Sequence, residues 1–143
     1  MRRTAIHEYE EICSISISMH DTDSMGVVWH GSYLKYFERA REQLLSSHGI
    51  TYKAMIDSGI CYPIVEQKTS YRRFITLKDE KIQVKAFIVE ACARLKIGYE
   101  VYTQKGELAC FGYTIQVALS VDDQQMLYEL PEVFSKEFPK CAL

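Results

Sequence analysis

The chain has 143 residues, of which 48% are apolar and 25% are charged, and its formal net charge is −2. This length predicts a single globular domain over residues 1–143 with a sizeable hydrophobic core. The slightly negative charge argues against a nucleic-acid-binding surface, which is usually basic.

Five cysteines are scattered along the chain without a Cys-x-x-Cys pair, so the sequence predicts neither a disulfide framework nor a zinc site. Reduced thiols favour a cytoplasmic location. The first residues, MRRTAIHEYEE, contain two arginines without an apolar run behind them, and no segment has the length of a membrane span. We therefore expect a soluble cytoplasmic protein without a bound metal.

The first predicted element is a strand, because apolar residues from Cys13 to Met19 alternate with serines and His20. This strand brings Asp21 and Asp23 to its end.

A helix is predicted next, with Ser32 as its N-cap and Gly49 as its stop. The apolar residues of one helix face are Tyr33, Phe37, Ala40 and Leu44. The unpaired N–H groups and the dipole of a helix N-terminus favour an ionised carboxylate nearby, and they also bind a developing oxyanion. The two acids that precede this helix therefore suggest a hydrolytic site.

Arg41 falls within the apolar arc of this helix, with Glu38 at its edge. A buried guanidinium needs a carboxylate partner, and Glu38 is the nearest one in the sequence. The pair has two interpretations, a structural ion pair or a pair of which one member contacts a ligand.

The remainder of the chain is predicted to be mostly strand. Residues 50–58 form a short, poorly capped helical turn that ends at Gly59, and Pro131 starts a terminal helix over 132–138. The predicted strands cover 62–74, 82–92, 94–103 and 108–119, with a turn at 77–81 and a hairpin at 104–107. The alternating apolar residues are Ile82, Val84, Ala86 and Ile88 in one strand, Leu95, Ile97, Tyr99 and Val101 in the next, and Phe111, Tyr113, Ile115 and Val117 in the last. Five antiparallel strands leave open edges, so we expect an oligomer.

The stretch DTDSMGVVWHGSYLKYFERAR, residues 21–41, resembles the signature of the hotdog-fold acyl-CoA thioesterases. The likeness is to the 4-hydroxybenzoyl-CoA thioesterase-like family, in particular its Tol-Pal-associated branch, and the order of elements agrees to about Leu119. The resemblance implies an α+β hotdog fold with a five-stranded antiparallel sheet wrapped around one long central helix. It also implies a continuous ten-stranded sheet in a dimer, frequent assembly into a homotetramer, and an active site built from both subunits.

The resemblance further implies the roles of individual residues. Asp23 matches the catalytic carboxylate of the family, and Asp21 matches the preceding acid, which is usually not assigned chemistry. His30 stands where this branch often has a histidine and other members a tyrosine. Glu38 and Arg41 match the Glu-Arg-Ala-Arg end of the signature.

The implied reaction is hydrolysis of an acyl-CoA to the free acid and coenzyme A, which is part of the substrate, so no cofactor is expected. A thiolate whose thiol has a pKa near ~8.5 leaves without a strong general acid. Asp23 would either attack the carbonyl carbon or deprotonate a water molecule, and the sequence leaves both open. Backbone N–H groups between Val27 and Tyr33, or in the turn at 59–62, would bind the carbonyl oxygen.

Several further residues are candidates for a supporting role. Gly26 and Val28 lie in the signature, and Met25 replaces a residue that is often small, which would reshape the acyl pocket. His30 either positions Asp23 or the substrate, or only hydrogen-bonds the turn. Candidates to bind the phosphates of coenzyme A are Arg72, Arg73, Arg94 and Lys96, although each also fits a solvated strand position.

Four other functions make different demands on the sequence. A calcium loop counted from Asp21 would put Met25 and Ser32 at ligand positions, which excludes it. An aspartate-dependent phosphatase would need a parallel sheet and a longer chain. A hotdog dehydratase, which uses a histidine and an acid across the dimer, and a non-catalytic acyl-CoA-binding or scaffold protein remain as alternatives. Asp23 argues against the scaffold, because a carboxylate near a bound thioester adds little affinity.

Overall fold

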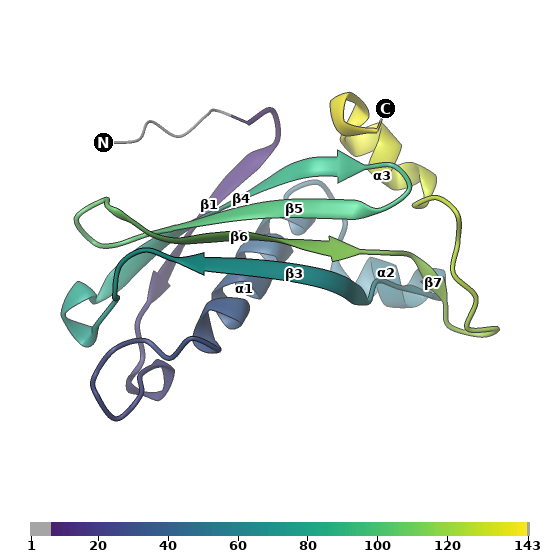
Figure 1. The fold of residues 1–143 in the computed structure, drawn as a ribbon. Coiled ribbons are helices and arrows are strands. Elements are labelled where there is room, and N and C mark those ends of the chain that lie inside the picture. The colour runs from purple at the N-terminus through teal and green to yellow at the C-terminus, as the bar shows by residue number, and fades with distance from the viewer. Residues whose placement is uncertain (1–6, 143) are drawn as a thin grey trace.

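The computed structural model describes residues 7–142. Its main element is an antiparallel sheet of five strands in the order β1-β4-β5-β6-β3, with α1 (Ser32–Ser46) on one face (Figure 1). The strands are β1 (Glu10–Ser16), β3 (Ile64–Tyr71), β4 (Lys81–Ala91), β5 (Leu95–Tyr102) and β6 (Leu108–Gln116). The smaller elements are α2 (Tyr52–Ser58), α3 (Glu132–Glu137), the pair β2 (Ile60–Cys61) and β7 (Leu119–Ser120), and short 3-10 turns at Met19–Asp21, Leu77–Asp79 and Pro139–Cys141.

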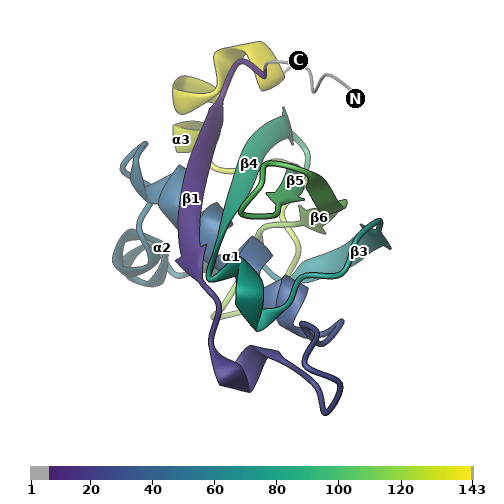
Figure 2. The same ribbon diagram turned by 90° about the vertical axis from the view of Figure 1, so that its left-hand side faces the viewer.

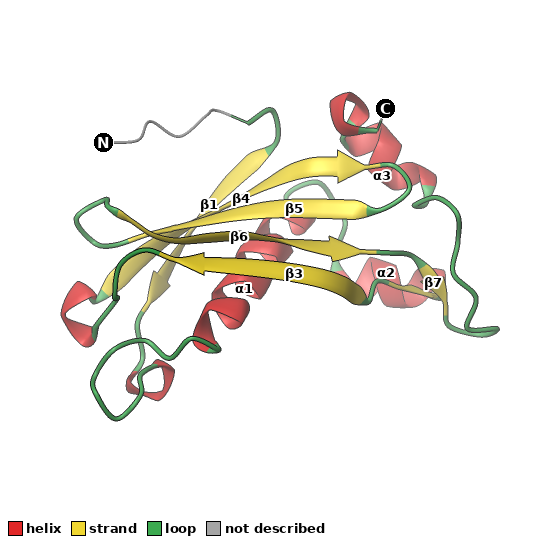
Figure 3. Ribbon diagram, in the orientation of Figure 1, coloured by secondary structure: helices red, strands yellow, loops and turns green. Residues whose placement is uncertain are grey.

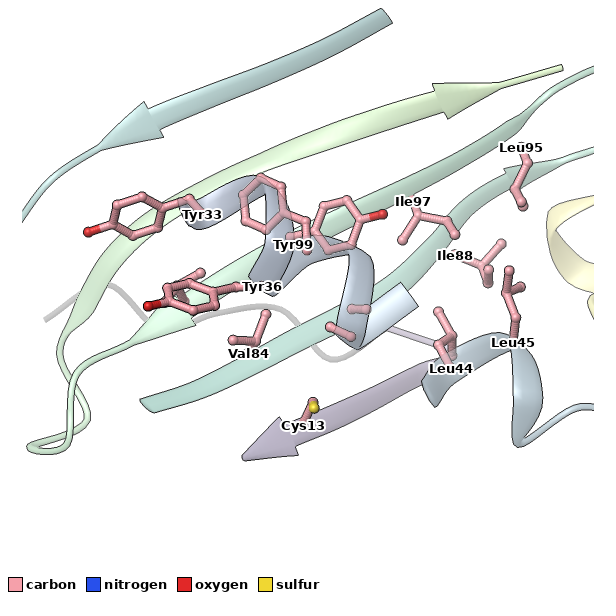
Figure 4. Packing of buried hydrophobic residues seen from close by; sticks show 14 of the residues in the cluster. Cys13, Tyr33, Tyr36, Leu44, Leu45, Val84, Ile88, Leu95, Ile97 and Tyr99 are labelled. Carbon is pink, nitrogen blue, oxygen red and sulfur yellow. The ribbon is translucent and has the colours of Figure 1, made fainter. Parts of the chain in front are cut away.

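The apolar face of α1 packs against the sheet as the sequence predicts. Tyr33, Phe37, Ala40 and Leu44 are all buried, and Figure 4 shows Tyr33 and Leu44 together with Tyr99 of the sheet. The ring of Phe37 stacks on that of Tyr99 with 4.4 Å between centroids. Seen from the side, the sheet curves over α1 (Figure 2). With 15 residues, α1 has an ordinary length, so the expected long central helix is not confirmed.

Several predicted boundaries are wrong because local hydrogen bonds decide them. The first strand ends at Ser16, because Ser18 caps the 3-10 turn Met19–Asp21 that follows. Gly31, not Ser32, is the N-cap of α1, and the Ser32 hydroxyl donates instead to the carbonyl of Asp21 at 2.9 Å.

The second helix, α2, is also better capped than predicted. The Thr51 hydroxyl accepts a hydrogen bond from the N–H of Ala54, and Gly59 adopts a left-handed conformation at the C-cap. A hydroxyl cap before the helix and a glycine after it thus fix a helix of only seven residues.

The predicted apolar faces of β4 and β5 are confirmed, whereas that of β6 is wrong. Phe111 and Tyr113 pair with Glu100 and Gly98 and lie on the sheet face away from α1, where they are partly exposed. The side chain that faces α1 at this level is Thr114, whose hydroxyl lies 2.7 Å from the Tyr99 hydroxyl. Large aromatic residues are favoured on any partly covered sheet surface, so their alternation did not identify the core face.

The sheet has two open edges, as the sequence predicts. β1 and β3 are the outer strands, and no second strand pairs with the free side of either within residues 7–142. The β3 edge exposes Ile64 and Val65. An exposed edge of this length is a surface on which another strand can pair.

Because the thiol of Cys110 is buried, the free energy of unfolding is expected to change with pH in the alkaline range. Burial raises the pKa of Cys110 from 9.0 to about 12, so the thiol stays protonated in the folded chain at a pH where it ionises in the unfolded chain. The unfolded state therefore binds fewer protons, and the free energy of unfolding is expected to fall as the pH rises from 9 towards 12. Urea denaturation of the parent chain and Cys110→Ala at a series of pH values measures this slope. Equal slopes for the two proteins would contradict the assignment to Cys110.

Candidate active site

A loop without regular strands connects β1 to α1 (Figure 3) and contains Asp23. The Asp23 N–H donates to the carbonyl of Val27 at 2.8 Å, and the Gly26 N–H donates to the carbonyl of Asp23 at 3.1 Å. Gly26 has a φ of +80°, which favours glycine. The Asp23 Oδ1 accepts the N–H of Met25 at 2.8 Å, so backbone hydrogen bonds fix the side chain.

The same loop is anchored to the rest of the domain through its backbone. The Val28 N–H donates to the carbonyl of Ile75 at 2.7 Å, and the Trp29 N–H donates to the carbonyl of Asp21 at 2.8 Å. The Val28 side chain is buried in the core. Gly26 and Val28 thus shape the turn that carries Asp23.

Asp23 borders a cleft of about 490 Å³ between this loop and the end of β3. The lining residues are Asp23, Val27, Val28, His30, Tyr33, Tyr71, Arg72, Arg73 and Phe74. The Tyr71 hydroxyl donates to the carbonyl of His30 at 3.1 Å, and the rings of Tyr33 and Tyr71 pack edge to face. Burial raises the pKa of Tyr33, so its hydroxyl stays neutral.

Unpaired N–H groups lie at the start of α1, beside the cleft. Between Val27 and Tyr33, the N–H groups of Val27, Val28, Trp29 and Ser32 have partners. Those of His30, Gly31 and Tyr33 make no hydrogen bond to any residue of the described chain. These donors are free to bind a carbonyl oxygen or an anion.

Asp21 has a structural position. Its Oδ2 accepts the N–H of Ser18 at 3.0 Å, which closes the 3-10 turn, and its carbonyl accepts from Trp29 and Ser32. Burial and the nearby Asp21 charge raise the pKa of Tyr36. Asp21 therefore stabilises the loop through these hydrogen bonds, whereas Asp23 borders the cleft.

Two of the four predicted phosphate-binding residues reach the cleft. Arg72 and Arg73 line both this cleft and an adjoining cavity of about 650 Å³, which also contains Lys78 and Lys105. Arg73 forms an ion pair with Glu107 at 3.0 Å, and the Arg72 guanidinium lies 5.4 Å from the centre of the Phe111 ring.

The other two predicted residues lie at the opposite end of the sheet, at the turn into β5. Arg94 pairs with Glu90 at 3.1 Å, and the Lys96 ammonium lies 4.4 Å from the centre of the Tyr113 ring. In a single chain neither residue lines the Asp23 cleft.

Glu38 and Arg41 lie outside the Asp23 cleft and do not form the expected ion pair. Both line a separate cavity of about 560 Å³, and Glu38 is exposed. The turn at 59–62 contributes Ile60, Cys61 and Tyr62 to this second cavity, so it offers no oxyanion donor to Asp23 of the same chain.

Sequence reasoning missed the aromatic wall of the cleft. Tyr71 and Phe74 come from the end of β3 and the loop after it, and Phe74 is 82% exposed. Exposed aromatic residues in a loop are a signal for a ligand surface. The sequence alone did not show that the end of β3 lies beside the start of α1.

Residues 7–142 hold no cluster of three or more metal-binding side chains, and none of the helices in this range is long and apolar enough to cross a membrane. The five cysteines, all within this range, are unpaired in the structure.

Comparison with known proteins adds relatives of the same size. The YneP protein of Bacillus subtilis, whose name assigns it provisionally to the acyl-CoA thioesterases, is 26% identical over 126 residues, which are 87% of each chain. The structure of the DHNA-CoA thioesterase of Staphylococcus aureus is 30% identical, covers 92% of this chain and 85% of its own, and superimposes with a TM-score of 0.78. The 1,4-dihydroxy-2-naphthoyl-CoA thioesterase Slr0204 of Synechocystis shares the fold, with a TM-score of 0.82 at 22% identity over 91% of this chain and 96% of its own.

Residues 17–138 match the thioesterase-like superfamily. This range contains the Asp23 loop, α1 and every strand of the sheet except β1. The five-stranded antiparallel sheet with its few helices is the hotdog-like fold of these enzymes. The similar structures described above are named as DHNA-CoA and 1,4-dihydroxy-2-naphthoyl-CoA thioesterases. The chain itself belongs to the thioesterase-like superfamily.

Proposed function

We propose that this protein hydrolyses an acyl-CoA thioester to a carboxylic acid and coenzyme A, with Asp23 as the catalytic carboxylate. One observation carries the proposal. The Asp23 carboxylate is held by the Met25 N–H at the border of a cleft, beside unpaired N–H groups at the start of α1. The membership of the superfamily supports the same chemistry.

In this mechanism Asp23 has one of two roles. As a general base it takes a proton from a water molecule that attacks the thioester carbon. As a nucleophile it forms a mixed anhydride, which water then opens to regenerate the carboxylate. In both routes the thiolate of coenzyme A leaves and takes up a proton from solvent.

The carbonyl oxygen of the thioester would accept hydrogen bonds from the N–H groups of His30 and Gly31. These donors have no partner among the described residues, and the dipole of α1 favours negative charge at its N-terminus. His30 would thus act as a donor through its backbone N–H, and as a residue that lines the cleft it would also position the substrate through its side chain.

Coenzyme A would lie across Arg72 and Arg73, with its phosphates towards the adjoining cavity that holds Lys78 and Lys105. Guanidinium groups bind phosphate through two parallel hydrogen bonds. Arg94 and Lys96 are not part of this path in the same chain.

The functional unit would be a dimer joined edge to edge through β3, which extends the sheet to ten strands. The free side of β3 supports this arrangement, as does its exposed Val65. Two such dimers would form a homotetramer. Membership of the Tol-Pal-associated branch and a cytoplasmic location are further parts of the proposal.

Release of coenzyme A from a panel of straight-chain and aromatic acyl-CoAs tests the proposed activity. A thiol reagent measures the product, and a blank without substrate corrects for the five cysteines of the chain. We expect turnover of at least one acyl-CoA above the rate without protein.

Two other outcomes would contradict the proposal. Binding of acyl-CoAs without thiol release would indicate the non-catalytic alternative. Loss of the double bond of a 2-enoyl-CoA without thiol release would indicate a dehydratase.

A further inference from the structure

The second cavity, of about 560 Å³, lies between α1, α2 and β2 and shares no lining residue with the Asp23 cleft of the same chain. Its walls are mainly apolar. The apolar lining residues are Leu45, Ile50, Met55, Ile56 and Ile60. A cavity with such walls is suited to the carbon skeleton of an acyl group.

Two polar groups of this cavity have unused hydrogen-bonding capacity. The half-buried Arg41 makes one long hydrogen bond, from Nη1 to the Tyr99 hydroxyl at 3.4 Å, and no carboxylate of residues 7–142 lies within ion-pair distance. Gln116 is only 7% exposed, and its Nε2 donates to the carbonyl of Tyr62 at 2.8 Å. Its Oε1 accepts no hydrogen bond from the described chain.

Hydrogen-bond donors and acceptors that stay unpaired at a buried site lower the stability of the fold unless a ligand pairs with them. Arg41 has guanidinium N–H groups left over that can donate to a ligand, whereas the Gln116 Oε1 is itself buried. An oxygen atom on the ligand fits these groups better than a methyl group does.

The position of the cavity relative to β3 connects it to catalysis in the dimer. Tyr71, at the end of β3, lines the Asp23 cleft, whereas Tyr62, just before the start of β3, lines the second cavity. When two β3 strands pair antiparallel about a twofold axis, the start of one lies beside the end of the other. The second cavity of one subunit then adjoins the Asp23 cleft of the other.

We propose that the second cavity receives the far end of an acyl group whose thioester lies at Asp23 of the other subunit, and that Arg41 selects acyl groups with an oxygen atom at that end. This inference rests on the proposed hydrolase function and its dimer. The oxygen belongs to a hydroxyl or a carboxylate group. Glu38 and Glu42 line the same cavity and oppose a second negative charge, which favours the hydroxyl.

The variant Arg41→Met tests the selection with matched substrates. The probes are hexanoyl-CoA, octanoyl-CoA and benzoyl-CoA, each beside its terminal hydroxy and carboxy counterparts. We expect the ratio of kcat/KM for the oxygen-bearing substrate to that for its unsubstituted counterpart to fall about tenfold to a hundredfold, the effect of losing a hydrogen bond from a charged donor. A fall with only the hydroxy or only the carboxy substrates identifies the group.

Two variants control this test. Arg39→Met removes an exposed arginine from the same helix and should leave every ratio unchanged. Arg41→Lys keeps a donor and should restore part of the ratio. An unchanged ratio in Arg41→Met for all substrates would overturn the proposal, whereas absence of turnover by the parent protein would refute the hydrolase function itself.

A mixed dimer tests whether the cavity acts across the interface. One subunit carries Asp23→Asn and the other Arg41→Met, and two different affinity tags isolate the mixed species. Only a cross-subunit site combines the intact Asp23 with the intact Arg41, so we expect about half of the parental rate with the parental ratio. If the mixed dimer shows the kcat/KM ratio of the Arg41→Met protein, the cavity acts within its own chain. If light scattering shows a stable monomer, the proposed interface does not form.

Discussion

Asp23→Asn is expected to lower kcat for acyl-CoA hydrolysis by about a hundredfold to ten-thousandfold, the usual contribution of a positioned acid or base. The amide oxygen of asparagine can still accept the N–H of Met25, so the turn should keep its shape. What the variant loses is the basic and nucleophilic oxygen. Thiol release under saturating substrate measures kcat, and thermal unfolding shows whether the fold is kept.

The matched control for this variant is Asp122→Asn, which makes the same chemical change at an exposed acid far along the chain. It should leave kcat unchanged. Equal rates for Asp23→Asn and the parent would refute the role of Asp23, even if the protein is a thioesterase.

Gly112→Ala is expected to lower the free energy of unfolding by about 3 kcal/mol, at the upper end of the range for overpacked sites. Gly112 pairs with Thr69 of β3 and with Tyr99 of β5. A Cβ atom at this position would overlap the backbone carbonyl oxygen of Lys68, which cannot move away by rotating a side chain. Because β3 also carries Tyr71, we expect kcat/KM to fall as well, and urea denaturation with the thiol assay measures both effects.

Gly49→Ala separates this steric effect from the ordinary cost of replacing a glycine. Gly49 has a φ of +77°, but a Cβ atom at this position would meet no atom within 4 Å beyond its chain neighbours. Its replacement should cost about 1 kcal/mol through backbone conformation alone, and it should leave kcat/KM unchanged. Equal losses in the two variants would show that the approach of Lys68 to Gly112 is unimportant.

The sequence predicted those parts of the fold that depend on local periodicity. The buried positions of α1, from Tyr33 to Leu44, follow from the helical period, and the alternation of β4 and β5 follows from the period of a strand. The two acids precede α1 as predicted, but the strand before them ends at Ser16 and does not reach them. The face of β6 was not predicted correctly, because Thr114 is buried through a hydrogen bond to Tyr99, which lies 15 residues away in the sequence.

The candidate site was predicted in part. Asp23, His30, Arg72 and Arg73 come together at one cleft, although the sequence spacing between the loop and the end of β3 gave no measure of their distance. Arg41 was identified as an anomaly of the helix. Its expected partner Glu38 stays in solvent, because hydration of an exposed carboxylate competes with a surface ion pair.

Trp29 is the single tryptophan of the chain, and it is 49% exposed. Its indole lies beside the imidazole of His30, with 4.8 Å between the ring centroids. Emission from this ring therefore originates within the loop that holds Asp23. Its intensity and wavelength give an intrinsic optical signal of changes in that loop, without a dye or a label.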